Sequence, residues 1–276
     1  MIRRACVIGQ PITHSRSPVI HRFWLAELGI EGDYVALPVE PPKVARFLAE
    51  FPESGFVGAN VTIPHKQAAY AAVAEADPVA QATGAVNTLW LEGKRLCGAN
   101  TDAEGFLANL DQQAPGWDRG GGRALILGAG GAARAIAWGL TRRDLAVAVV
   151  NRTPARAEEL ATQLGPPVTA EAWRDIPRLL ASAKLLVNAT PLGLRGQPAL
   201  DIDLAPLADS AIVADIVYVP LKTPLLAAAE ARGLATVDGL GMLLHQAVPG
   251  FERWFRQRPV VGGAVRAAVV ADLDRR

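Results

Sequence analysis

The sequence has few cysteines and histidines, almost no net charge and no long apolar segment, and each scarcity argues against a class of protein. The two cysteines, Cys6 and Cys97, match no metal-binding spacing, which predicts buried, reduced thiols and a cytoplasmic location. The four histidines form no paired spacing, so we expect no metal. A formal net charge of +1 favours neither nucleic acid nor an anionic membrane as a partner.

Half of the 276 residues are hydrophobic, yet no apolar run approaches the roughly 18 residues of a membrane span. The first residues enter a strand-like run directly, so we expect no signal peptide and no membrane association. This length suits one large or two medium-sized domains and is easily enough to bury a core.

Short apolar runs alternate with segments of helical spacing along the whole chain, which predicts an α/β fold. Strand-like runs occur at 5–8, 34–39, 58–61, 124–127, 146–150, 185–189 and 212–217, and a hairpin joins 85–91 to 95–98. We expect an N-terminal α/β substrate domain of residues 1–102, completed by helices within 240–276. A Rossmann-type nucleotide-binding domain with a parallel sheet is expected at 103–239.

The segment 123–140 carries the strongest motif, a strand, a glycine turn and a helix with the pattern G-x-G-x-x-A. Gly128 would permit the tight turn, Gly130 would admit a pyrophosphate, and Ala133 would keep helix and strand close. The N–H groups and positive dipole end of the helix would face the phosphates. Residues 1–102 contain no such loop, so we expect them to bind the substrate.

The next strand-like run ends at Asn151, Arg152 and Thr153, with Arg156 one turn later. An NAD site usually has an Asp or Glu at this place, to hold the ribose 2′-hydroxyl. A carboxylate would repel a 2′-phosphate, whereas a guanidinium can bind it bidentately. The segment therefore predicts NADP rather than NAD, the alternative being an arginine that is merely on the surface.

Lys66 and Asp102 are candidate proton-transfer groups. Lys66 is expected in the first turn of a helix that begins after Pro64, where the macrodipole disfavours a cation, and such placements are often functional. The alternative is a solvated lysine at the helix start. Asp102 lies at an expected helix start, where the same dipole favours a carboxylate for purely structural reasons. A Lys–Asp pair near a nicotinamide could transfer the proton that accompanies hydride transfer.

Other polar residues have two interpretations each. Ser17 is expected to cap the helix that Pro18 begins, but Ser15 is less well explained by capping and both hydroxyls suit a ligand. Asn87 would need a backbone or ligand partner. Tyr218 either packs or offers its hydroxyl to a ligand, and Asp77 with Pro78 is expected to form a turn after a helix.

Eight segments in one order make the chain resemble the shikimate dehydrogenase family over nearly its whole length. They are 15–18, 60–66, 84–88, 100–102, 128–132, 151–153, 188–191 and 241–246. The resemblance implies NADPH-dependent, reversible reduction of 3-dehydroshikimate to shikimate, in the biosynthesis of aromatic amino acids.

The resemblance also implies roles for individual residues. Lys66 and Asp102 would be the catalytic pair, in contact with the substrate. The other implied substrate-binding residues are Ser15, Ser17, Asn60, Thr62, Asn87, Tyr218 and Gln246. The implied cofactor-binding residues are Asp77, Gly128, Ala129, Gly130, Gly131, Ala132, Asn151, Arg152, Thr153, Arg156, Thr190, Ile216, Gly239 and Met242. Pro249 is expected to kink the helix that carries Gln246.

Two alternatives remain at this stage. One is a quinate/shikimate dehydrogenase of the same family, with NAD or NADP as its cofactor. The other is a catalytically silent NADP-binding regulatory protein, because a fold does not determine a function. The chain is expected to be a monomer or a homodimer.

Overall fold

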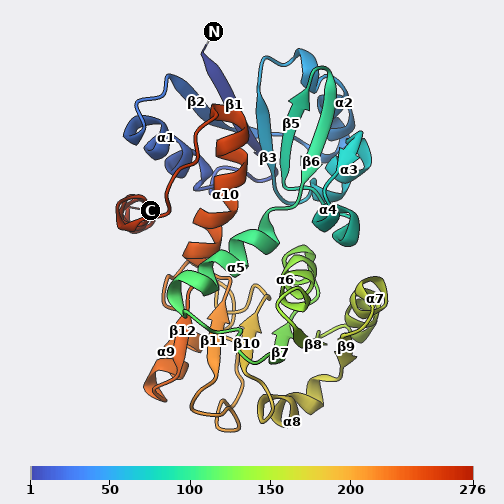
Figure 1. Cartoon of the computed structure of the whole chain (residues 1–276), viewed down its shortest axis with the longest axis vertical. Helices are drawn as coiled ribbons and strands as arrows, with labels where there is room; N and C mark the ends of the chain where they lie inside the picture. The colour runs from blue at the N-terminus through green and yellow to red at the C-terminus, as the bar shows by residue number, and fades with distance from the viewer. Residues whose placement is uncertain (1, 276) are drawn as a thin grey trace. The chain divides into compact units, whose positions relative to one another are not determined.

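Two six-stranded sheets organise the chain in this computed structural model, which describes residues 2–275 (Figure 1). Unit 1 is Met1–Thr101 with Leu244–Arg276, and unit 2 is Asp102–Leu243. Within residues 2–275, no helix has the length and apolarity that crossing a membrane requires.

The sheet of unit 1 has the strand order β2-β1-β3-β5-β6-β4. Its strands are β1 (Arg3–Gly9), β2 (Gly32–Pro38), β3 (Gly58–Val61), β4 (Glu75–Ala76), β5 (Thr88–Glu92) and β6 (Arg95–Ala99). β1 pairs in parallel with β2 and β3, whereas β5 is antiparallel to both β3 and β6. The predicted strand at 58–61 and the predicted hairpin are therefore confirmed, although β5 begins three residues later than expected.

Two of the helices of unit 1 have a proline in their first turn. The helices of this unit are α1 (Ser17–Glu27), α2 (Val44–Ala49), α3 (Lys66–Ala72), α4 (Pro78–Thr83) and α11 (Gly263–Asp274), with 3₁₀ turns η1 (Pro41–Lys43) and η2 (Phe51–Glu53). α10 (Gly239–Phe255) begins in unit 2 and ends in unit 1. Its helical assignment continues through Pro249.

An aromatic cluster fills one side of the unit 1 core. The His21 ring stacks on Tyr34 with centroids 3.9 Å apart and lies within 6 Å of the Trp24, Phe251 and Trp254 rings. His21 is completely buried, and this burial lowers its pKa from 6.5 to about 3. The cluster therefore holds a neutral imidazole as an aromatic packing element.

The depressed pKa of His21 predicts a pH-dependent stability. Below about pH 6.5 the unfolded chain binds a proton at His21 that the folded chain does not, so the free energy of unfolding falls by about 1.4 kcal/mol per pH unit down to about pH 3. Urea titrations at about pH 7 and pH 4.5 give the fall in the free energy of unfolding over this range. For His21→Phe this fall should be about 2–3 kcal/mol smaller than for the wild type. His14→Ala, at an exposed position, should follow the wild type; a parallel loss in His21→Phe contradicts the prediction.

Gly58 allows β3 to pass beneath the Trp254 indole. A Cβ at Gly58 would lie 1.8 Å from Trp254 Nε1, which donates a 2.9 Å hydrogen bond to the Leu89 carbonyl. We expect Gly58→Ala to lower the free energy of unfolding by about 3 kcal/mol, measured by urea denaturation. Gly263→Ala is the matched control and should change it by less than about 0.5 kcal/mol, because a Cβ there meets no atom within 4 Å.

The sheet of unit 2 is parallel throughout, in the order β12-β11-β10-β7-β8-β9. Its strands are β7 (Gly122–Leu127), β8 (Leu145–Val150), β9 (Val168–Glu171), β10 (Leu185–Asn188), β11 (Ile212–Asp215) and β12 (Ala235–Val237). The helices are α5 (Asp102–Gln113), α6 (Gly131–Thr141), α7 (Pro154–Leu164), α8 (Ile176–Leu180) and α9 (Pro224–Ala231), with the 3₁₀ turn η3 (Trp173–Asp175). Separate apolar clusters cover the two faces of this sheet, so the predicted α/β class with a parallel Rossmann-type sheet is confirmed.

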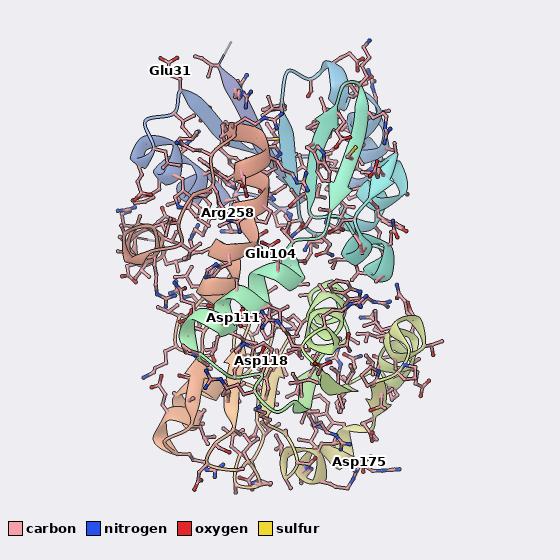
Figure 2. All side chains as sticks on the ribbon, in the orientation of Figure 1. Glu31, Glu104, Asp111, Asp118, Asp175 and Arg258 are labelled. Atoms are coloured by element: carbon pink, nitrogen blue, oxygen red, sulfur yellow. The ribbon has the colours of Figure 1, made fainter. Side chains whose placement is uncertain are left out.

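The loop between α5 and β7 is held by charge pairs. Asp111 on α5 and Asp118 in the loop both bind Arg143, with oxygen–nitrogen distances of 2.7 and 2.6 Å (Figure 2). The hydrogen bond that Arg143 donates to Asp118, followed by the one that it donates to Asp111, raises the pKa of Arg143 above its usual value. These ion pairs therefore fix the path of the polar, glycine-rich loop into β7, the first strand of unit 2 along the chain.

Candidate functional site

The topology of unit 1 gathers its candidate residues at one edge of the sheet. β1 and β3 are parallel and end at this edge, and the antiparallel β5 begins there opposite Asn60. β6, antiparallel to β5, ends at the same edge and continues into Asn100 and Thr101. Segments far apart in sequence, around residues 10–17, 60–66, 87 and 100–101, therefore meet at this edge, because β1, β3 and β6 end there and β5 begins there.

Ser15 and Ser17 follow β1, but the predicted capping role of Ser17 is wrong. α1 begins at Ser17 itself, Arg16 is the residue before it, and no side chain caps this helix end. Instead the Ser17 backbone N–H donates to Ser15 Oγ at 3.3 Å. Ser15, which capping explained poorly, is therefore the serine whose side chain hydrogen bonds to the backbone at the start of this helix. The Ser17 side chain is buried and hydrogen bonds with Tyr34.

Tyr34 fixes the amide of Asn60. Burial raises the pKa of Tyr34 well above its usual value, so its hydroxyl keeps its proton and donates to Asn60 Oδ1 at 2.6 Å. The Asn60 amide nitrogen then donates to the Asn87 carbonyl at 3.2 Å and to Thr88 Oγ1 at 3.3 Å. The orientation of this buried amide is therefore determined by protein contacts.

Asn87 joins three chain segments within unit 1. Its Oδ1 accepts from the Thr101 backbone N–H at 2.9 Å, and its Nδ2 donates to Gln246 Oε1 at 3.4 Å. The Thr101 hydroxyl lies 2.8 Å from the Gln246 carbonyl. A backbone N–H thus satisfies one hydrogen-bonding group of the Asn87 side chain, as the backbone-partner interpretation predicted. The Gln246 side chain lies beside it.

Lys66 is the first residue of α3, as the sequence predicted. Its carbonyl accepts from the Val86 N–H at 2.9 Å, which ties the helix start to the segment before Asn87. The preceding residue, His65, is buried and its Nε2 lies 2.6 Å from the Val39 carbonyl. Thr62 lies between β3 and this helix and bonds through its N–H to the Ile8 carbonyl.

Asp77 begins a helix, so the turn predicted at Asp77 and Pro78 is wrong. It is the N-cap of α4, and Oδ1 accepts from the Ala80 N–H at 2.8 Å and from the Asn100 N–H at 3.0 Å. Burial raises the pKa of Asp77 above its usual value, against the lowering by these hydrogen bonds. Asp77 therefore anchors the segment that leads into Asp102, the buried first residue of α5.

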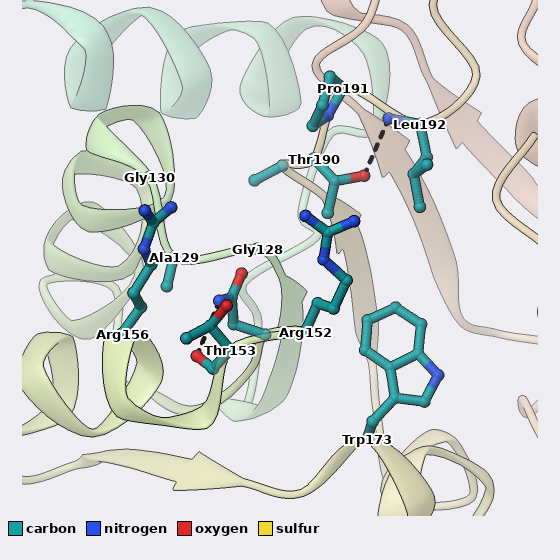
Figure 3. Close-up of a pocket in the computed structure, with 12 residues that line it drawn as sticks. Gly128, Ala129, Gly130, Arg152, Thr153, Arg156, Trp173, Thr190, Pro191 and Leu192 are labelled. Carbon is teal, nitrogen blue, oxygen red and sulfur yellow. Dashed lines mark hydrogen bonds between the residues drawn. The ribbon is translucent and has the colours of Figure 1, made fainter. Parts of the chain in front are cut away.

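Unit 2 contains a pocket of about 570 Å³ at the carboxyl ends of β7, β8 and β10 (Figure 3). Eight of the predicted cofactor-binding residues line it: Gly128, Ala129, Gly130, Asn151, Arg152, Thr153, Arg156 and Thr190. The other lining residues are Trp173, Ala189, Pro191 and Leu192. Among the described residues, therefore, no acidic side chain lines the pocket. Ligands of open parallel sheets bind at this edge.

The glycine turn shapes one side of this pocket. Gly128 has φ +108°, and a Cβ there would lie 2.8 Å from the Ala189 carbonyl oxygen. A Cβ at Gly130 or Gly131 would meet no atom within 4 Å, and α6 has no acidic residue in its first turn. A pyrophosphate therefore fits this open cradle at the helix N-terminus, where unpaired N–H groups favour an anion.

A buried polar network holds the opposite side of the pocket. Asn188 Nδ2 donates to Asp215 Oδ1 at 2.9 Å, and Asn188 Oδ1 accepts from the Thr190 N–H at 3.1 Å. Asp215 Oδ2 accepts from the Thr223 hydroxyl at 2.7 Å, while burial raises the pKa of this carboxyl. The loop that carries Thr190 and Leu192 is thus ordered from beneath, and Thr190 Oγ1 accepts from the Leu192 N–H at 3.1 Å (Figure 3).

The remaining predicted residues of unit 2 lie outside the pocket lining. Ile216 follows β11, and its carbonyl oxygen would lie 2.3 Å from a Cβ on Gly239, the first residue of α10. Met242 packs in the same apolar cluster as Ile216. Tyr218, two residues after Ile216, is half-buried. Gly131 and Ala132 form the first turn of α6.

Of the four lining residues that were not predicted, Ala189, Pro191 and Leu192 flank Thr190, whereas Trp173 lies in a segment that the sequence analysis did not single out. It follows β9, a four-residue strand that was not predicted because Val168 is its only large apolar residue. The signal that could have identified it is an aromatic residue directly after a strand of the parallel sheet, since side chains there reach the carboxyl edge.

One group of described residues has metal-type ligand atoms within 4.8 Å of one another: Glu75, Glu92 and Cys97. Glu75 already forms an ion pair with Arg95 at 2.6 Å. Desolvation and the nearby Glu92 raise the pKa of the Cys97 thiol, which disfavours the thiolate that binds metals. The ion pair between Glu75 on β4 and Arg95 on β6 therefore accounts for the position of Glu75.

The parallel sheet, the glycine turn and the arginine-lined pocket together define a dinucleotide-binding protein of the Rossmann class, joined to a second α/β unit. Models of two domain families match the chain: "Shikimate dehydrogenase substrate binding domain" over residues 7–89 and "Shikimate / quinate 5-dehydrogenase" over residues 112–192.

Proteins similar to this chain match it over nearly its whole length. Shikimate dehydrogenase (NADP(+)) of Azorhizobium caulinodans is 57% identical over 273 residues, covering 99% of this chain and 97% of that protein. The solved shikimate 5-dehydrogenase of Thermus thermophilus, in complex with NADP(H) and shikimate, has a TM-score of 0.88 at 39% identity, covering 98% and 100%. Quinate dehydrogenase of Corynebacterium glutamicum, in complex with NAD, has a TM-score of 0.89 at 29% identity, covering 98% and 99%. The chain belongs to the shikimate dehydrogenase family.

Proposed function

We propose that this protein catalyses the NADPH-dependent, reversible reduction of 3-dehydroshikimate to shikimate, a step in the biosynthesis of aromatic amino acids. Family membership and the NADP(+)-dependent relatives at 57% identity support an oxidoreductase with this cofactor. The observation that carries the proposal is the unit 2 pocket, lined by two arginines and no carboxylate.

The unit 2 residues would bind the cofactor in two ways. The Arg152 and Arg156 guanidinium groups would hold the 2′-phosphate, with Asn151 and Thr153 as further polar partners. The N–H groups at the start of α6 would face the pyrophosphate beside Gly130. Ile216, Gly239 and Met242 are proposed to contact the nicotinamide half, and Asp77 supports Asn100 and hence Asp102.

The unit 1 residues would orient the substrate. Ser15, Ser17, Asn60, Thr62, Asn87 and Gln246 are proposed to bind its carboxylate and hydroxyl groups, together with Tyr218 of unit 2. Both amide hydrogens of Asn60 already have protein acceptors, so its contribution to a ligand would be the acceptor Oδ1. Prearranged polar groups of this kind reduce the entropy lost on productive binding.

Lys66 and Asp102 are proposed to manage the proton. NADPH, when bound, supplies the hydride that reduces the substrate ketone. Lys66 Nζ would donate the proton to the ketone oxygen and stabilise the negative charge that develops on it. Asp102 would orient the ammonium group for this transfer. In the oxidative direction Lys66 accepts the proton from the hydroxyl.

The proposal is tested by following the near-ultraviolet absorbance of NADPH with the purified full chain. Shikimate with NADP⁺ should give rapid reduction of the cofactor, and quinate or NAD⁺ should give a much lower kcat/KM. Preference for quinate with NAD⁺ would support the quinate-type alternative, which the solved quinate dehydrogenase motivates. NADP⁺ binding without turnover of either acid would support a regulatory protein. The cytoplasmic location and the choice between monomer and homodimer stay predictions from the sequence.

A further inference from the structure

Trp173 is an exposed indole at the edge of the pocket. It is 40% exposed and is the only aromatic among the exposed large hydrophobic residues of the described chain. It lines the pocket, and it also lines a second hollow of about 270 Å³ with Ile176, Pro177 and Ile202. Because this exposed indole lines two hollows, packing within the protein does not account for a large aromatic side chain here.

The pocket has chemically distinct ends. In Figure 3, Arg156 lies beside Gly130 on one side, whereas Trp173 lies near Arg152 and on the same side as Leu192. Pro191 and Leu192 come from the ordered loop after β10, so this second side is apolar apart from the Arg152 guanidinium and the Thr190 hydroxyl, which already accepts from the Leu192 N–H. One end of the pocket therefore suits phosphate groups, and the other suits a flat, weakly polar ring.

We infer that the Trp173 indole is a stacking surface for the adenine ring of the dinucleotide, which determines affinity without distinguishing NADP from NAD. The inference rests on the proposed function, since it concerns the same cofactor pocket. A base stacks on an aromatic side chain through its π-face. The indole contacts the part that NADP and NAD share, whereas the 2′-phosphate contacts would belong to Arg152 and Arg156.

Titration calorimetry with NADP⁺, NAD⁺ and adenosine 2′-monophosphate tests the inference on the full-length protein. Trp173→Ala should raise the Kd of all three by the same factor, about 10-fold, whereas Trp173→Phe should stay within about 3-fold of the wild type. Trp138→Phe is the matched control, a partly exposed tryptophan of unit 2 outside the pocket, and should leave each Kd unchanged. NADP⁺ should quench tryptophan fluorescence in the wild type and in Trp138→Phe, and quench it much less in Trp173→Phe.

Two results would overturn the stacking role while leaving the proposed function intact. One is a Kd for NADP⁺ within about 2-fold of the wild type in Trp173→Ala, with the wild type binding normally. The other is a selective loss of NADP⁺ over NAD⁺, which would assign the indole to the 2′-phosphate end. A wild-type chain that binds none of the three probes would instead overturn the proposed function together with this inference.

Discussion

Replacing Lys66 with alanine should lower kcat for shikimate oxidation by about 10³-fold or more while the Kd of NADPH stays near the wild-type value. The reason is that a positioned acid–base group contributes about 10²- to 10⁴-fold, and the loss of a charge that stabilises the alkoxide adds to this effect. Lys66 does not line the unit 2 pocket, so binding of the dinucleotide should be retained. Stopped-flow rates and a fluorescence titration with NADPH measure the two quantities separately.

The matched control for Lys66→Ala is Lys94→Ala, an exposed lysine in the hairpin turn of the same unit. It removes the same charge and should leave kcat unchanged. Ordinary activity in Lys66→Ala would remove Lys66 from the mechanism. A variant that loses NADPH binding as well would show instead that the substitution disturbs the whole protein.

Replacing Arg152 with alanine should raise the KM for NADP⁺ by about 10- to 100-fold and leave the KM for NAD⁺ within about 3-fold. A charge-assisted hydrogen bond contributes about 1.5–3 kcal/mol, and only NADP⁺ carries the 2′-phosphate that accepts it. Steady-state kinetics with both cofactors at saturating shikimate give the ratio directly.

Arg174→Ala is the control for Arg152→Ala, because Arg174 is an exposed arginine next to Trp173 that does not line the pocket. It changes the net charge equally and should leave the NADP⁺ to NAD⁺ preference unaltered. If Arg152→Ala weakens both cofactors to the same degree, the 2′-phosphate assignment fails. The three variants at Lys66, Arg152 and Trp173 therefore separate proton transfer, phosphate selection and base stacking.

Local sequence determined the parts of this protein that depend on backbone requirements over a few residues. The glycine turn at Gly128 was readable because only a residue without a side chain fits beneath the Ala189 carbonyl at φ +108°. The strand at Gly58–Val61 and the helix start at Lys66 follow from an apolar run and a proline, which act within one turn of the chain. The asparagine and arginine after β8 likewise indicated the cofactor, since they occupy a fixed place in the strand–turn–helix pattern.

Tertiary structure decided what depends on contacts between distant segments. Ser17 failed as a cap because its side chain hydrogen bonds with Tyr34, and Asp77 begins a helix while it also holds Asn100. Asn60, Asn87 and Gln246 come together only through the sheet order and the return of α10, which no local pattern encodes. Trp173 escaped notice for the same reason: its place depends on a short strand that forms because β8 pairs with it. Sequence thus specified turns, strands and residue chemistry, whereas the folded sheets selected which side chains share a site.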